Sequence, residues 1–176
     1  MRRETAAALG ALVASGLMLV VTVAAAPARV TAKQSFSGVI VASGESGTRT
    51  IESTVVVAWG VFNGDGRVVE VTNRPGDPDN VSRDNLVFSR GTMHLVTTNK
   101  PATPSVNTKT CVVKIVIRQT QKIQGGTGAF RHAAGSFAGT LRGRGVAARN
   151  PDGTCSEEMP QLIEVAVFSL GGTLSL

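Results

Sequence analysis

The chain has 176 residues, which is enough for one domain with a moderate core. Its 20 glycines, frequent Val, Thr and Ser, and scarcity of helix formers past residue 30 indicate a β protein with many tight turns. The net charge of +6 favours anionic surfaces without naming one, and 1 Trp with no Tyr leaves few rings on which nucleic-acid bases could stack, so no nucleic acid is expected as a partner.

The first 28 residues have the pattern of a secretory signal peptide. Met1-Arg2-Arg3 is positive, residues 6–26 are almost wholly apolar, and Ala26-Pro27-Ala28 supplies the small residues that signal peptidase needs. An uncleaved anchor is the alternative, because about 20 apolar residues can span a bilayer. Either way we expect residues 29–176 to form a single domain outside the cytoplasm, secreted or in the cell envelope.

The first half of this domain is predicted to hold four strands. Asn63-Gly64-Asp65-Gly66 is a hairpin turn, because Asn and Gly tolerate the positive φ that such turns demand. Residues 54–59 are apolar on both faces, which indicates a strand buried on both sides or one that crosses a barrel wall under a cover. The expected strands are 35–41, 48–62, 67–72 and 86–98, the last with a bulge at Gly91, and residues 73–84 are expected as loop.

The second half is predicted to hold three strands. Residues 111–123 alternate, with Val113, Ile115 and Ile117 apolar at odd positions and even positions that include Lys114, Arg118 and Lys122, so one face is packed and the other wet. A loop over 99–109 precedes this strand. A glycine turn (125–128), one helical turn (129–134) and strands 136–148 and 161–170 follow it.

The two cysteines, Cys111 and Cys155, are expected to form a disulfide, since an isolated pair in an oxidising compartment usually bonds. An antiparallel pairing of 111–123 with 136–148 would bring the two sulfurs to the same end of the hairpin. Seven or eight strands joined mostly by short turns, with no long helix, predict an all-β fold. We expect a closed antiparallel barrel, with a β-sandwich as the alternative.

The stretch from Ile123 to Phe137, IQGGTGAFRHAAGSF, resembles the hairpin of the allene oxide cyclase and dirigent superfamily, where a strand runs into GGTG-x-F and a short A-x-G segment. Similar stretches occur in uncharacterised secreted bacterial proteins of that barrel type. The resemblance implies an eight-stranded antiparallel barrel with a hydrophobic interior cavity, and dirigent relatives trimerise, so a dimer or trimer is possible. Ala134 stands where dirigent proteins usually carry Arg, so only the fold is carried over.

No convergent catalytic group is visible in the sequence. Gly44-Glu45-Ser46-Gly47 lacks the spacing of a nucleophile elbow, and the only histidines are His94 and His132. The Gly125–Gly128 turn is not followed by the Lys of a phosphate-binding loop. We therefore expect no cofactor and no metal site.

Three functions follow as expectations. The first is non-enzymatic binding of a small apolar or amphipathic molecule inside the barrel, and the second is a cyclase- or isomerase-type enzyme with a buried carboxylate, for which Glu52, Glu70 and Glu164 are candidates. The third is an envelope module that binds anionic polymers through a basic stripe on the wet face. The residues proposed for ligand binding are Trp59, Phe62, Glu70, Phe88 and His94, and those for the stripe are Lys114, Arg118, Arg142 and Arg144.

Overall fold

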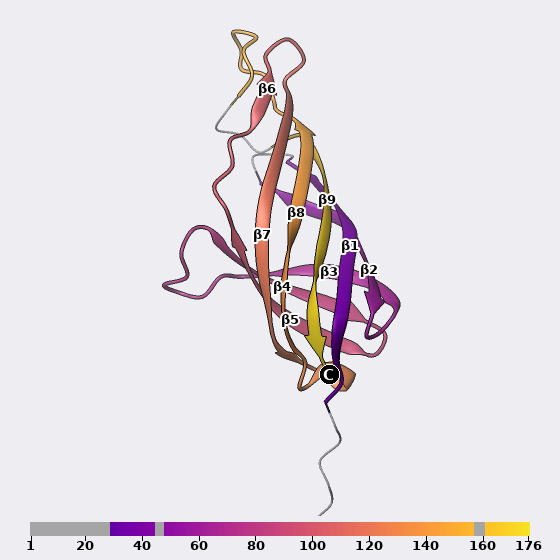
Figure 1. The fold of residues 1–176 in the computed structure, drawn as a ribbon. Coiled ribbons are helices and arrows are strands. Elements are labelled where there is room, and N and C mark those ends of the chain that lie inside the picture. The colour runs from indigo at the N-terminus through magenta and orange to yellow at the C-terminus, as the bar shows by residue number, and fades with distance from the viewer. Residues whose placement is uncertain (1–28, 45–47, 157–160) are drawn as a thin grey trace, which may run out of the picture.

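The computed structural model describes residues 29–44, 48–156 and 161–176, and the predicted signal peptide lies outside these ranges. The described residues form an antiparallel β-barrel (Figure 1). Its strands are β1 (Thr31–Ser43), β2 (Thr50–Gly60), β3 (Gly64–Val71), β4 (Val81–Phe88), β5 (Gly91–Asn99), β6 (Ser105–Asn107), β7 (Val112–Gly126), β8 (Ala134–Val146) and β9 (Ile163–Ser175), with a short 3-10 turn, η2 (Gly128–Phe130).

Pairing between β5 and β7 closes the sheet. The order is β5-β4-β3-β2-β1-β9-β8-β7, and the additional β5–β7 ladder joins the two ends, while β6 is an extra strand on the outer end of β7. This ladder closes an eight-stranded barrel. The predicted barrel is confirmed, and the β-sandwich alternative is wrong.

One predicted strand is two strands in the structure. Residues 86–98 were expected to run straight through a bulge at Gly91, but β4 and β5 form a hairpin in which Phe88 pairs with Gly91. Gly91 has a φ of +139°, and a Cβ there would lie 2.3 Å from the carbonyl oxygen of Thr127, so only glycine fits this turn. The predicted loop 73–84 is also too long, because β4 begins at Val81.

The hairpin that carries the family resemblance is present. Residues of β7 and β8 pair antiparallel from Val112–Val146 to Gln124–Ala134, as the alternation predicted. The Cys111–Cys155 disulfide is confirmed, with its Cα atoms 5.4 Å apart at the end of this hairpin. Its presence is compatible with an oxidising, extracytoplasmic location.

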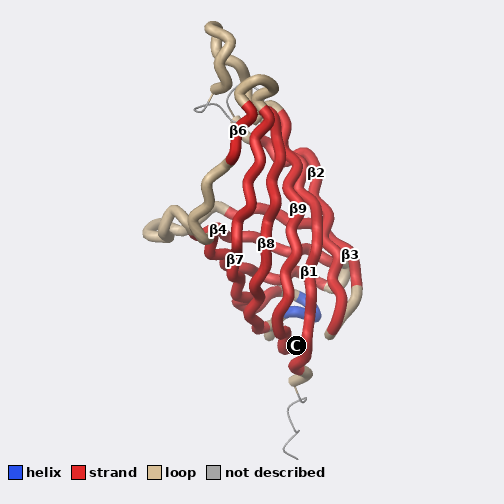
Figure 2. The backbone as a smooth tube through the Cα atoms, turned by 45° about the horizontal axis from the view of Figure 1, so that its top comes forward, coloured by secondary structure: helices blue, strands red, loops and turns tan. Residues whose placement is uncertain are grey.

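The glycine turn after β7 fastens onto the β4–β5 hairpin. Thr127 donates its N–H to the Thr92 carbonyl at 2.8 Å, and its hydroxyl accepts the Thr92 N–H at 3.1 Å. A Cβ at Gly126 would lie 2.0 Å from the Thr92 carbonyl oxygen. Glycine at this position therefore serves close backbone contact between two turns, which also explains why η2 lies at that end of the barrel (Figure 2).

A cluster of phenylalanines closes that same end of the barrel. Phe36 and Phe130 are fully buried, and their rings lie within van der Waals contact of further phenylalanines, with centroids 5.1 Å apart for Phe36–Phe137 and 4.9 Å for Phe62–Phe130. Tilted and edge-on rings of this kind fill space well. We call Phe36, Phe62, Phe88, Phe130 and Phe137 the aromatic plug. The cavity described in the next subsection lies in the opposite half of the interior.

Candidate functional site

The interior half opposite the aromatic plug contains a cavity of about 510 Å³. This volume is typical of sites for small organic ligands. Its deep wall is apolar, and the lining side chains there are Ile40, Val68, Leu86, Leu95, Ile117, Leu141, Ala166, Phe168 and Leu170. Charged and amide side chains lie among the remaining lining residues: Arg49, Glu70, Asn73, Arg83, Asp84, Asn99, Gln119, Gln121 and Glu164.

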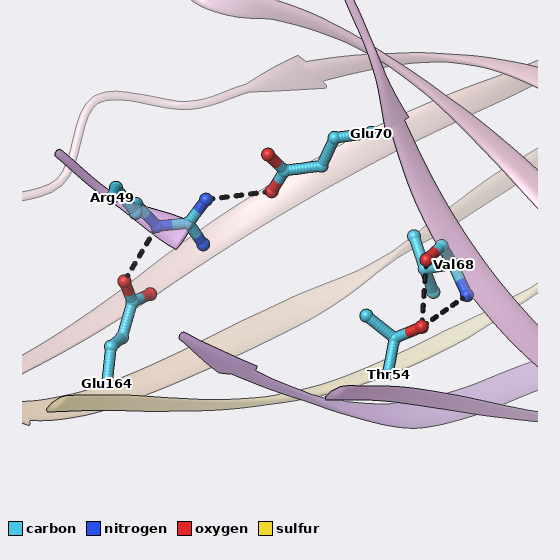
Figure 3. A network of polar contacts seen from close by, with 5 residues as sticks. All are labelled: Arg49, Thr54, Val68, Glu70 and Glu164. Carbon is cyan, nitrogen blue, oxygen red and sulfur yellow. Dashed lines mark hydrogen bonds and ion pairs between the residues drawn. The ribbon is translucent and has the colours of Figure 1, made fainter. Parts of the chain in front are cut away.

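The barrel wall separates between β2 and β3 at the level of this cavity. The β2–β3 ladder runs only from Ala58–Gly64 to Val56–Gly66. Beyond it the Thr54 hydroxyl takes over, accepting the Val68 N–H at 3.0 Å and donating to the Val68 carbonyl at 2.8 Å (Figure 3). A threonine side chain thus replaces a backbone partner where the strands diverge.

Arg49 spans the mouth of the cavity. Its guanidinium lies 2.9 Å from Glu70 on β3 and 3.0 Å from Glu164 on β9, so one cation bridges two carboxylates from different strands (Figure 3). The Glu70 side chain is 49% exposed and the Glu164 side chain 24%. Exposed ion pairs of this kind contribute little to stability, so this cluster fixes the charges at the entrance rather than the fold.

Asp84 is the carboxylate that lies deeper in the cavity. It stands directly opposite Glu70 across the β3–β4 ladder and accepts a 3.3 Å hydrogen bond from the Thr97 hydroxyl. Burial raises the pKa of Asp84 to about 6, and the neighbouring Glu70 carboxylate raises it as well, against hydrogen bonds from Thr97 and Ser82 that lower it. A carboxyl group with a pKa this close to neutrality beside an apolar wall is a feature of binding and catalytic sites.

Two glutamines of β7, Gln119 and Gln121, also line the cavity. Gln119 donates its side-chain amide to Asn99 at 2.8 Å, so both of these amides are engaged. Gln121 lines the cavity and is 8% exposed, yet its Oε1 has no hydrogen-bond partner. A buried acceptor without a partner costs free energy, so Gln121 is a position where a ligand can contribute the missing bond.

Of the residues that the sequence proposed for ligand binding, Glu70 lies at the cavity. Phe62 and Phe88 belong to the aromatic plug and lie outside the lining. Trp59 and His94 point outward: Trp59 is 72% exposed, and the His94 ring lies 2.7 Å from Asn85 on the outer surface. The side-chain period of two explains both, because the inward positions of β2 and β5 are occupied by Val56, Ala58, Met93 and Leu95. The expected cover over residues 54–59 is absent from the described chain, and Val55 and Val57 are also exposed.

The four basic residues predicted to form a stripe do come together on the outer wall. Lys114 stands directly opposite Arg144, Arg142 lies opposite Val116, and Arg118 lies opposite Thr140. All four basic side chains are exposed, and none takes part in the ion pairs found among the described residues. Like charges in direct cross-strand contact are unfavourable, so the sheet does not gain stability from this arrangement.

The sequence reasoning missed the residues that give the cavity its polarity. Asp84 was assigned to a loop, Arg49 to the outer part of a strand, and Gln119 and Gln121 drew no attention although they continue the inward row of Val113, Ile115 and Ile117. The period of two extended past Ile117 would have identified the glutamines as inward-facing polar residues.

Searches for relatives and for other kinds of site add little. Across residues 29–44, 48–156 and 161–176, no helix has the length and hydropathy of a membrane span, and no three His, Cys, Asp or Glu side chains cluster as metal ligands would. No family model, curated protein or solved structure shows a significant match to the chain.

Proposed function

We propose that this chain is an exported barrel protein that binds one small amphipathic molecule in its interior without altering it. The observation that carries the proposal is the cavity of about 510 Å³, apolar in its depth and polar at its mouth, at one end of a closed barrel. Eight-stranded barrels can hold one small ligand in this way. The signal-like first 28 residues and the disulfide support export.

The architecture favours binding because the two ends of the interior differ. The aromatic plug fills one end, so we expect a ligand to enter from the opposite half, where β2 and β3 diverge. The apolar lining removes the hydrophobic part of a ligand from water, while the polar groups at the mouth orient its other end.

The first test is uptake of an apolar fluorophore, together with native mass spectrometry of the secreted protein before and after organic extraction. We expect Ala166→Phe, which fills the cavity from its wall, to weaken fluorophore binding about tenfold. The added ring takes the place of part of the ligand, and the apolar contact that the ligand loses corresponds to about that change in affinity. The matched control, Val165→Phe, adds the same ring to the neighbouring exposed position and should bind like the wild type. Equal binding by both variants, or no uptake by the wild type, contradicts the proposal.

A second candidate function uses the same cavity, and we propose it because of Asp84. A carboxyl group with a pKa of about 6 can both give and take a proton near neutral pH, as an isomerase or cyclase requires. The extraction experiment separates the two functions. An isomerase would return an added ligand with unchanged mass and changed chromatographic retention, whereas a binding protein would return the same compound.

For the outer wall we propose contact with anionic envelope polymers through the basic stripe. The direct juxtaposition of Lys114 and Arg144 without a described acidic partner supports it. We expect Lys114→Glu/Arg144→Glu to weaken binding to vesicles of anionic phospholipid about tenfold, and added salt to do the same to the wild type. Lys33→Glu/Arg90→Glu, exposed positions remote from the stripe, makes the same change in net charge and should have a small effect. Binding that is insensitive to both salt and the stripe variant would exclude this role.

A further inference from the structure

Several donors of the polar lining are already engaged by acceptors of the chain itself. The Arg49 guanidinium is held by Glu70 and Glu164, and the Gln119 amide is held by Asn99. The Arg83 guanidinium is held by Asp77, with two contacts of 2.7 and 2.9 Å. The Oε1 of Gln121, by contrast, is a buried acceptor without a partner, and a ligand group that donates a hydrogen bond would satisfy it.

Two acceptors, the Asp84 carboxylate and the Oε1 of Gln121, lie on β4 and β7, which are the two neighbours of β5. Thr97 on β5 donates to Asp84 on β4, and across the next ladder Thr97 is paired directly with Gln121 on β7. Asp84 and the unpartnered Oε1 of Gln121 therefore flank the same residue on the cavity wall. An ammonium group bound over Thr97 would have the carboxylate on one side of it and the amide oxygen on the other.

The charge of the lining has the opposite sign to that of the protein. The lining carries three carboxylates, Glu70, Asp84 and Glu164, and two guanidinium groups, of which that of Arg83 is paired with Asp77. Arg49 alone is left to balance the three carboxylates. The interior is thus negative in a chain whose formal net charge is +6. In a site with low-dielectric walls this field attracts a cation and repels a carboxylate.

We propose that the molecule held in this cavity is a lipophilic amine, whose ammonium group is bound by Asp84 and Gln121 while its apolar body packs against the deep wall. This inference rests on the proposed binding function. It identifies the class of ligand as organic cations with a hydrocarbon part. Fatty acids carry a carboxylate that the negative lining would repel, and neutral lipids carry no charge for it to attract.

The test compares three probes of equal chain length, n-octylamine, n-octanol and octanoate, titrated calorimetrically into the secreted protein at about pH 7.5. We expect octylamine to bind about tenfold or more tightly than octanoate, with octanol between them. Asp84→Asn should weaken octylamine binding about tenfold and change octanol binding less than twofold. Gln121→Leu should weaken the binding of both octylamine and octanol, because each of them donates a hydrogen bond.

The control variant is Asp65→Asn, which removes the same charge from an exposed residue at the start of β3 and should leave all three affinities unchanged. Octanoate binding as tightly as octylamine, or octylamine binding that is unaffected by Asp84→Asn in a folded variant, overturns the amine assignment and leaves the binding function standing. Failure of all three probes to bind overturns the binding function itself, and the amine assignment with it.

Discussion

Replacing both Cys111 and Cys155 by alanine is expected to lower the free energy of unfolding by about 4 kcal/mol. The bridge joins residues separated by 44 positions, and the chain-entropy model assigns about that much to a closed loop of this length. The loop contains the whole β7–β8 hairpin, so the unfolded chain gains much freedom when the bridge is removed. Urea unfolding of the two proteins measures the difference.

Two comparisons make this result interpretable. Wild-type protein treated with a reductant should approach the stability of the double variant, and Thr108→Ala, an exposed change beside the bridge, should remain close to the untreated wild type. A loss below about 1 kcal/mol would mean that the β7–β8 ladder keeps this loop ordered after the bridge is broken. The oxidising compartment in which the two neighbouring cysteines meet would then explain the bridge better than a gain in stability does.

The parts of the fold that the sequence predicted are those with two agreeing local patterns. The alternation over 111–123 and the positions of the two cysteines indicated the same hairpin, and β7, β8 and the disulfide are as expected. The turn between them was recognised from its glycines, Gly125, Gly126 and Gly128. The structure explains the glycine at position 126 by a backbone contact that leaves no room for a side chain.

The β4–β5 hairpin was missed because its turn carries weak sequence information. Ser89-Arg90 is not a typical tight-turn pair, and Gly91, which makes the turn possible, was taken for a bulge. The contact that selects glycine there comes from Thr127, more than thirty residues away in sequence. A local pattern cannot reveal such a contact.

The candidate site was missed because its residues break the hydrophobic alternation from which strands are recognised. The strand β4 begins at Val81, but its inward positions Ser82 and Asp84 are polar because they line the cavity. Trp59 was misplaced for the converse reason: an aromatic residue was expected inside, although the period of two assigns it to the exposed row of Val55 and Val57. Polar interiors and apolar exteriors are both departures from the pattern that folding alone would select.

Asp84→Asn is expected to stabilise the protein by about 1–3 kcal/mol near pH 7.5 and to leave its stability unchanged near pH 4. The pKa of Asp84 rises from its usual 3.8 to about 6 on folding, so the folded protein binds more protons than the unfolded chain between those values. Wild-type stability therefore falls as the pH rises through this window, by at most about 1.4 kcal/mol per pKa unit, and the half-buried position reduces that amount. Asparagine cannot ionise, so the variant lacks this fall.

Urea unfolding of both proteins between about pH 4 and 7.5 measures the effect, with Asp65→Asn showing what the same exchange does at an exposed position of β3. The charged groups around Asp84 are Glu70 across the β3–β4 ladder, Arg83 beside it in its pair with Asp77, and Arg49 and Glu164 at the mouth. A parallel pH profile for variant and wild type would show that the Asp84 carboxylate is well solvated. The Asp84 carboxyl would then keep its usual pKa, and the isomerase or cyclase function proposed for it would lose its basis.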